Sequence, residues 1–466
     1  MKNNKRIGRM VSALCLLCAL WLYAAAVRAE ARLHSGVLRY RLREDGGAVI
    51  LSHSGQGSDL LVPDEVEGHP VIALGEGLFH GRTELLSISL PKRLEEIGSH
   101  AFAGCTSLKT LPALPNLRRI GSYAFADCVS LTELPLGSSL EQAGEYAFMG
   151  CSSLREARLP GSLREVEKGL LYQCGDLRSV TIGGGVILIR EAAFAECRNL
   201  AHVSFPASIE EIGDDAFQHS GIVSADLGEA VQRVGRNAFA DCLSLGVVSM
   251  EEGIRTLGER AFGGCENLQS LVLAKSLEKI ADDALEATPK LQSLCAVPES
   301  YAARWLAAHS YDALPLLRSA DGLYDYSLTP QGKAVIVRCR SRQQRLAVPG
   351  LLDGYPVESI GARAFSDLAS LQSAALPQGL LSLGSHAFSD CRALEEVVLG
   401  EDLRMIEQEA FYGCEKLRRM RIPASVKFIG DFAFFDSSIE HFEIAQGSWA
   451  EGWAMKNGYA YRCVAE

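Results

Sequence analysis

Apolar side chains recur along this chain with a period of 23 residues, and one phenylalanine marks each repeat. Phe79, Phe102, Phe125 and Phe148 are each 23 positions apart. With one step of 22, the same position continues through Leu171, Phe194, Phe217, Phe239, Phe262 and Leu285, and a second run holds Phe365, Phe388, Phe411 and Phe434. The chain is therefore an array of ten repeats followed by four.

Each repeat combines two kinds of apolar spacing. It resembles I-G-x-x-A-F-x-x-C-x-x-L-x-x-L-x-L-P-x-x-L-x-x, and the repeat from Ile189 to Glu211 keeps this spacing, with Phe194 and Cys197 in their places and Arg190 instead of the glycine. The L-x-L part alternates strictly and predicts a short strand that the proline ends, because proline cannot donate a ladder hydrogen bond. The A-F-x-x-C part has the spacing of a single helical turn, and the glycine before it predicts a corner with positive φ.

A single repeat of this size buries too little apolar surface to offset the loss of backbone freedom on folding. Stacked repeats share their apolar faces and pair their strands. The pattern therefore predicts a solenoid with a continuous parallel sheet on one side.

The array is divided and capped on a larger scale. The segment from Gly36 to Phe79 recurs as Gly322 to Phe365, and residues 300–311 resemble residues 448–459. Since an open solenoid end exposes apolar surface and a strand edge, these recurring segments are interpreted as caps. We predict two capped modules at 36–317 and 322–464, with a short joint that few contacts cross.

The first 29 residues have the features of an export signal. Basic residues precede an apolar run of 18 residues from Met10 to Val27, and Ala29 occupies the last position of a small-residue cleavage site. We expect cleavage after Ala29, which makes the protein secreted or displayed at the cell surface. Because the run is long enough to cross a bilayer, an uncleaved membrane anchor is the alternative. No other segment of the sequence is predicted to span a membrane.

The net negative charge of the chain disfavours nucleic acid and anionic lipid as partners. The formal net charge is −11, with 46 basic and 57 acidic residues. An acidic chain lacks the positive surface that binding to nucleic acid or to anionic lipid requires. We therefore expect no nucleic-acid partner.

The cysteines follow the repeat rather than a disulfide framework. One repeat position holds nine of the 14 cysteines: Cys105, Cys128, Cys151, Cys174, Cys197, Cys242, Cys265, Cys391 and Cys414. Stacked side chains point in parallel, so we expect buried unpaired thiols that pack as small apolar groups. Two alternatives stay open: a disulfide between two adjacent cysteines of this repeat position, and a Cys295–Cys339 disulfide across the joint. A metal site is not expected, since ligands on one wall cannot surround an ion.

Catalytic motifs are missing from the sequence. It contains no H-E-x-x-H, no G-x-S-x-G and no G-x-x-x-x-G-K-[ST]. His100 and His386, which share one repeat position, and the Asp214–Asp215 pair are interpreted as solvent-facing groups of the convex side. We predict no catalytic residue, no cofactor and no metal ligand, and so no enzyme.

The repeat, with its A-F-x-x-C element and matching ends, resembles the BspA-type leucine-rich repeat family of bacterial secreted and surface proteins. The resemblance covers essentially the whole chain after the signal. It implies a right-handed, curved leucine-rich-repeat solenoid, with short parallel strands on the concave side and short helical turns and loops on the convex side. It also implies a non-catalytic role in adhesion or protein–protein contact with an extracellular or surface protein, such as one of a host or a neighbouring cell.

Outward strand positions on the concave side are the candidate binding surface. The charged or imidazole residues there are Glu133, Glu156, Arg158, His202 and Asp226 in the first module and Arg418, Arg419 and Arg421 in the second. Glu396 and Arg419 fall on adjacent rungs, where an ion pair is expected. The remaining outward positions of the first module are mostly Ser and Thr, and an aromatic stripe is missing. A passive spacer of the cell envelope with no tight ligand is therefore the alternative function.

Overall fold

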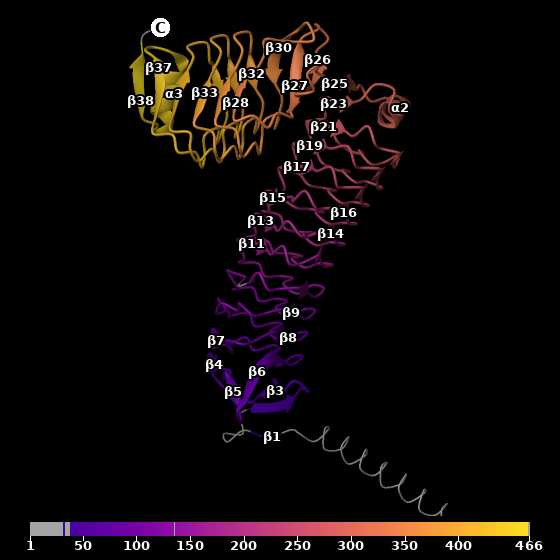
Figure 1. The fold of residues 1–466 in the computed structure, drawn as a ribbon, viewed down its shortest axis with the longest axis vertical. Helices are drawn as coiled ribbons and strands as arrows, with labels where there is room; N and C mark the ends of the chain where they lie inside the picture. Colours follow the sequence, from indigo (N-terminus) through magenta and orange to yellow (C-terminus); the bar gives the residue numbers. More distant parts are fainter. Residues whose placement is uncertain (1–30, 33–37, 135, 465–466) are drawn as a thin grey trace, which may run out of the picture. The chain divides into compact units, whose positions relative to one another are not determined.

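The repeats form a strand-dominated parallel solenoid, which confirms the predicted fold class (Figure 1). The computed structural model describes residues 31–32, 38–134 and 136–464. The predicted signal peptide and its cleavage site lie outside these residues. Two compact units are present: the first runs to Gly246 and includes Met250–Leu268 and Glu278–Lys290, and the second holds Val247–Ser249, Gln269–Leu277 and everything from Leu291.

The predicted L-x-L segments form strands on one side of the coils, here named together the long-strand sheet. In the first unit its members are β4 (Asp59–Leu61), β7 (Ser87–Ser89), β11 (Glu156–Leu159), β13 (Ser179–Ile182), β15 (His202–Ser204) and β17 (Ser224–Leu227). They are divided into several hydrogen-bonded groups, such as β4–β7 and β11–β13–β15, so the prediction of one continuous sheet is wrong. These strands lie along one side of the stack (Figure 1). Their parallel register advances by one coil, so that Glu156 is opposite Ser179 and Ser179 is opposite His202. Equivalent side chains of successive coils therefore stand in columns.

A second ladder of very short strands, which the sequence did not predict, lies on another side of each coil. Its members in the first unit are β8 (Glu96–Ile97), β9 (Arg119–Ile120), β10 (Gln142–Ala143), β12 (Glu165–Val166), β14 (Leu188–Ile189), β16 (Glu211–Ile212), β18 (Arg233–Val234), β20 (Thr256–Leu257) and β22 (Lys279–Ile280). We name it the short-strand sheet. It absorbs the one 22-residue step without a break, since Ile212 is opposite Val234.

A glycine follows most of the short strands, and it is required there for a different reason from the one expected. The sequence suggested a corner with positive φ, but Gly121 and Gly144 do not have one. A Cβ on Gly121 would lie 2.4 Å from the backbone nitrogen of Ser99 in the preceding coil. The glycine thus allows two coils to approach closely. The left-handed position is instead two residues further on, for example at Tyr123 with φ 57°.

The A-F-x-x-C segment forms hydrogen-bonded turns instead of the expected helical turn. The amide of Phe102 donates to the carbonyl of Ala124, 2.7 Å away in the next coil, and Phe125 does the same to Ala147 at 2.8 Å. An α-helix would direct these groups along its own axis. The turns direct them to the neighbouring coil, so even the loop side of the solenoid is tied together by backbone bonds.

The phenylalanine column fills the interior, as predicted. Phe102 and Phe125 stack with centroids 5.0 Å apart, and Phe125 and Phe148 follow at 5.4 Å. Their side chains are at most 1% exposed. Each ring covers the ring of the coil before it, so the core has no boundary between repeats.

The N-terminal cap of the first unit is a hairpin joined to the ladder. β1 (Ala31–Arg32), β2 (Leu38–Leu42) and β3 (Ala48–His53) are antiparallel neighbours, and β6 (His69–Leu74) pairs with β3 in parallel and with β5 (Glu65–Val66). β8 then adds to β6, so the short-strand sheet grows directly from the cap. The cap therefore pairs with the strand edge of the first coil, which would otherwise be exposed.

The second unit repeats this organisation after a first group of strands and a helix. That group is β19 (Val247–Met250, of which Met250 falls in the first unit), β21 (Ser270–Leu273), β23 (Ser293–Ala296), α2 (Tyr301–Ala308) and β24 (Leu314–Pro315). The second cap contains β25 (Leu317–Arg318), β26 (Tyr324–Leu328), β27 (Ala334–Cys339), β29 (Leu351–Leu352) and β30 (Tyr355–Ile360). The matching caps inferred from sequence thus share one topology. The module bounds of 36–317 and 322–464 stay a prediction.

The later coils of the second unit carry both ladders again. The long-strand sheet contains β28 (Arg345–Ala347), β31 (Ser373–Ala375), β33 (Glu396–Val398), β35 (Arg419–Ile422), β37 (His441–Ala445) and β38 (Tyr461–Val464). The short-strand sheet contains β32 (Ser382–Leu383), β34 (Met405–Ile406) and β36 (Phe428–Ile429). The terminal helix α3 (Trp449–Asn457) begins at Ser448, whose hydroxyl accepts a bond from the amide of Glu451. Trp453 of α3 covers Phe434, the last ring of the core column.

Truncating one core ring tests the shared interior. Phe194→Ala should lower the free energy of unfolding by about 3–5 kcal/mol, because a cavity opens between rings that cannot close up. Urea unfolding followed by circular dichroism measures this change. The matched control is Phe435→Ala, at a ring that is 55% exposed, where a change of less than about 0.5 kcal/mol is expected. Similar losses in both variants would contradict an inward Phe194.

Candidate functional site

The outward positions of the long-strand sheet place several predicted binding residues on one exposed face. Glu156 and Arg158 on β11 and Asp226 on β17 are exposed, and His202 on β15 is half-buried. No ion pair in the described residues includes Glu156 or Arg158. Glu133 is also exposed but lies outside the strands. Their role in binding is not tested by this geometry and stays a prediction.

The outward positions of the long strands are polar and exposed in the first unit and partly apolar in the second. In the first unit Arg158, Thr181 and Ser204 form one in-register column, Asp226 has the equivalent position on β17, and all four are exposed. On β19, β21 and β23 of the second unit the paired outward positions are Ser249, half-buried, Val272, 6% exposed, and Cys295, fully buried. Ser327 on β26 contacts the Cys295 thiol within the same unit. The second cap therefore packs on β23.

The basic cluster of the second unit is already partly neutralised. Arg421 on β35 lies 3.2 Å from the carboxylate of Glu401, and Arg418 lies 2.7 Å from that of Glu440. The ion pair expected between Glu396 and Arg419 is wrong, since no described ion pair joins them. Arg419 is exposed on β35 and remains the one residue of the cluster without a described ion pair.

The repeated cysteines are buried thiols with a specific hydrogen-bond partner. Each donates from Sγ to the backbone carbonyl of the phenylalanine position in the preceding coil, over 3.0–3.3 Å: Cys105 to Phe79, Cys128 to Phe102, Cys151 to Phe125, Cys174 to Phe148, Cys197 to Leu171, Cys242 to Phe217, Cys265 to Phe239, Cys391 to Phe365 and Cys414 to Phe388. A thiol is small enough for the core and adds a second hydrogen bond to a buried carbonyl that already accepts one from a backbone amide, as Phe102 does from the amide of Cys105.

Every cysteine in the described part of the chain is a free thiol. The disulfides that the sequence left open, between adjacent ladder residues or between Cys295 and Cys339, are therefore not formed. Burial raises the pKa of Cys151 to about 12 and that of Cys105 to about 11. These groups stay protonated at neutral pH and are poor nucleophiles.

The convex histidines are placed differently from the sequence interpretation. His386 does not face solvent: it is 6% exposed, and its Nδ1 lies 3.3 Å from the Glu409 carboxylate in the next coil. His100 is half-buried and stacks on Tyr123 with ring centroids 5.0 Å apart. Reading the residues 23 positions further along would have shown both partners.

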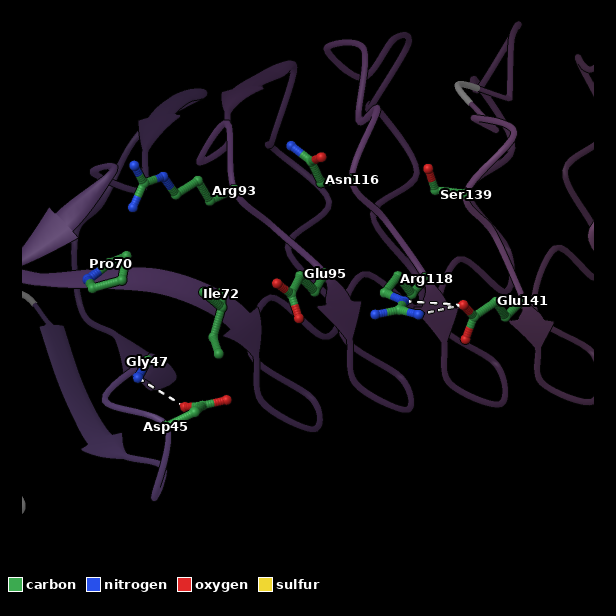
Figure 2. Close-up of a pocket in the computed structure, with 10 residues that line it drawn as sticks. All are labelled: Asp45, Gly47, Pro70, Ile72, Arg93, Glu95, Asn116, Arg118, Ser139 and Glu141. Atoms are coloured by element: carbon green, nitrogen blue, oxygen red, sulfur yellow. Dashed lines mark hydrogen bonds and ion pairs between the residues drawn. The ribbon is translucent and has the colours of Figure 1, made fainter.

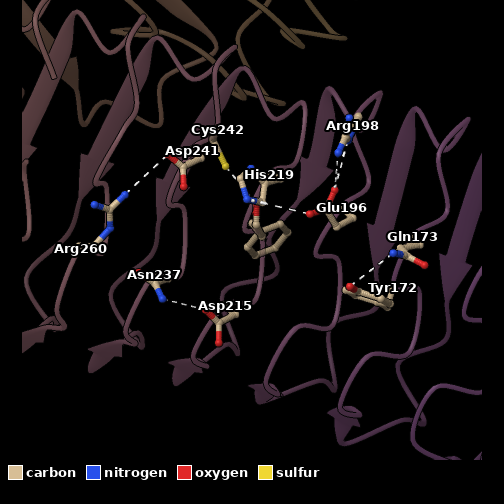
Figure 3. Close-up of polar contacts among 11 residues, drawn as sticks. Tyr172, Gln173, Glu196, Arg198, Asp215, His219, Asn237, Asp241, Cys242 and Arg260 are labelled. Carbon is tan, nitrogen blue, oxygen red and sulfur yellow. Dashed lines mark hydrogen bonds and ion pairs between the residues drawn. The ribbon is translucent and has the colours of Figure 1, made fainter. Parts of the chain in front are cut away.

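Acidic residues of the convex turns link neighbouring coils instead of forming an acid–base pair. Figure 3 shows Asn237 donating to Asp215 over 3.0 Å and His219 beside Glu196. Asp214 accepts bonds from the side chain of Arg233 and the amide of Arg236. In the described residues no group of three His, Cys, Asp or Glu could hold a metal ion.

A polar groove that sequence reasoning missed crosses the short-strand sheet near the first cap (Figure 2). Its volume is about 760 Å³, and it is lined by Asp45, Gly47, Pro70, Ile72, Arg93, Glu95, Asn116, Arg118, Ser139 and Glu141. Two columns, each with a spacing of 23, form its walls. Arg118 bonds Glu141 over 3.1 Å through Nε, so part of its charge is used internally. The charged column 95, 118 and 141 was visible in the sequence.

Family comparison confirms the resemblance found in the repeat. The model described as BspA type leucine rich repeat region (6 copies) matches residues 73–201, 166–292 and 354–449, which is more than half of the chain. The chain belongs to the BspA-type leucine-rich repeat family. Within this BspA-type chain, the described residues contain no helix with the length and apolar character needed to cross a bilayer.

Several solved structures similar to this BspA-type protein are leucine-rich repeat proteins of bacteria. A leucine rich cell surface protein from Faecalibacterium prausnitzii is 23% identical, with 90% of this chain and 96% of that chain covered and a TM-score of 0.37. A leucine-rich repeat protein from Bacteroides ovatus is 18% identical, with 92% of this chain and 98% of that chain covered and a TM-score of 0.39. The T. pallidum leucine rich repeat protein is 27% identical, with 51% of this chain and 91% of that chain covered and a TM-score of 0.37. No curated protein matches the chain.

Thiol labelling of the folded protein tests the cysteine column. Among the described cysteines only Cys463 is exposed. Near pH 8.5, about the ordinary pKa of a thiol, a maleimide should label Cys463 alone in the native state and all described cysteines after unfolding in urea. Mass spectrometry of the peptides identifies the labelled sites. Rapid native labelling of Cys151, or its recovery in a disulfide, would contradict the buried hydrogen-bonded thiol.

Proposed function

We propose that this protein is a secreted or cell-surface scaffold without catalytic activity that binds another extracellular protein through the exposed part of its long-strand sheet. The observation that carries the proposal is the set of exposed polar side chains on the in-register strands β11, β13 and β15 and on the nearby strand β17. The partner is an extracellular or surface protein of a host or a neighbouring cell. Export rests on the signal-like segment 1–29.

The array is suited to binding because its backbone is rigid and already satisfied. The strands β11, β13 and β15 pair through their amides and carbonyls, and β13 is held in place by a neighbour on each side. Side chains such as Glu156 and Arg158 are then presented with little loss of freedom on binding. Charges of both signs set the register of a partner more than its affinity.

The alternative of a passive spacer is favoured by one specific feature of this face. Ser179, Thr181, Ser204 and Ser224 fill much of it, and no aromatic side chain is among its outward positions. Strong protein interfaces centre on Trp, Tyr or Arg. Arg158 is the only residue of these types on the exposed part of the array.

Charge reversal on this face tests the binding proposal. Purified protein without residues 1–29 is immobilised, and retained extracellular proteins are quantified for the native chain and for Glu156→Lys/Asp226→Lys. Loss of complementary charge should reduce capture of a specific partner about tenfold. The control is Glu145→Lys/Glu259→Lys, which changes the net charge equally at two exposed residues of the convex turns.

The outcomes separate the two functions. Capture that falls with the first variant and not with the control supports the long-strand face. Equal capture by all three proteins would reject this site, and no specific capture by the native protein would favour the spacer.

A further inference from the structure

We propose that the turn of the last coil is a docking site for an apolar protein segment flanked by basic residues. The site is an aromatic patch made of Tyr412, Phe432 and Phe435, with Asp431 and Asp436 at its edge. It lies in the convex turn region and is separate from the long-strand face, so the two proposals stand on different residues.

The aromatic patch exposes an unusual amount of ring surface. Phe432 is 62% exposed and Phe435 is 55% exposed. Their ring centroids are 5.7 Å apart at an angle of 89°, and Tyr412 of the preceding coil stacks on Phe435 at 6.1 Å. The three rings are thus held by one another before any partner binds. Little freedom would be lost when an aliphatic side chain packs on them.

The repeat does not need these phenylalanines. The core position of this coil is Phe434, which is 3% exposed and stacks on Phe411 at 5.5 Å. In the three preceding coils the position of Phe432 holds Arg363, His386 and Glu409, and the position of Phe435 holds Ser366, Ser389 and Tyr412. Two exposed phenylalanines therefore appear where the other coils of this run mostly have polar residues. A cluster of this kind on a surface marks an interaction site.

The charge around the aromatic patch selects the partner. Asp431 and Asp436 directly flank the segment from Phe432 to Phe435 in the chain, and both are exposed. No ion pair in the described residues includes either of them. Lys or Arg beside an apolar anchor would complete the contact and steer its approach.

Two other occupants are disfavoured by the same charges. A second copy of this chain would bring Asp431 and Asp436 against their own equivalents, and like charges across an interface are repelled. An anionic lipid surface would be repelled as well, although the exposed rings alone would suit it. The acidic edge therefore points to a basic protein segment.

The test uses a defined peptide rather than an unknown partner. A fluorescein-labelled peptide of leucines flanked by lysines is titrated with the protein lacking residues 1–29, and anisotropy gives the dissociation constant. Phe432→Ala/Phe435→Ala keeps the net charge and should weaken binding about tenfold or more, as expected for the loss of two aromatic anchors. Asp431→Asn/Asp436→Asn should weaken binding several-fold and remove most of its salt dependence.

Matched controls separate the aromatic patch from general attraction to an acidic protein. Phe428→Ala removes another largely exposed phenylalanine, on β36, and should change the dissociation constant by less than about twofold. A peptide with glutamate in place of lysine should not bind. Circular dichroism verifies that the variants fold, which is expected since the exchanged side chains are exposed.

Four results would overturn the proposal. They are unchanged peptide binding by Phe432→Ala/Phe435→Ala, an equal loss in Phe428→Ala, self-association in sedimentation that this double variant abolishes, and binding to phosphatidylserine vesicles that it abolishes. The last two would assign the rings to a second copy or to a membrane. None of these results depends on the long-strand face, so failure here leaves the scaffold proposal untouched.

Discussion

Contact between successive coils is the constraint on which every other feature of this molecule depends. A repeat of 23 residues has no interior of its own, and its phenylalanine is covered only when the next coil is in place. Three sets of interactions then act across the same boundary. Rings stack, long and short strands pair, and the amides of the turns donate to the following coil, as Phe102 does to Ala124. The residues that recur from repeat to repeat are therefore those that make contacts between coils.

This constraint explains residue choices that otherwise look unrelated. Gly121 has no side chain because the backbone of the preceding coil occupies that space. The small side chain of Cys128 fits between two coils, and its thiol donates to the carbonyl of Phe102 in the preceding coil. Candidate binding residues are consequently those whose side chains lie outside the shared interior: in the outward strand columns, in the groove walls and at the tips of the turns. The candidate sites of this protein are all of that kind.

The sequence predicted what is periodic and missed what depends on single neighbours. The phenylalanine column, the buried thiols and the L-x-L strands follow from spacing alone. The two-residue strands of the short-strand sheet are too short to show an alternation of apolar and polar residues, so the sequence did not predict them. Cys295 is buried beside Ser327, a residue of the second cap that the repeat spacing does not place there. His386 and Glu409 could have been paired, because residues 23 apart are neighbours in a solenoid.

The thiol column has a consequence for how such a chain would mature. In an exported protein each of these cysteines meets an oxidising environment while the chain is unfolded, and a wrong disulfide would block the stacking of two coils. Once a coil is covered, its sulfur is shielded from oxidants and from other thiols. The yield of correctly folded protein would then depend on whether the thiols are buried faster than they are oxidised. A solenoid that extends from an existing edge, coil by coil, has a topology that favours fast burial.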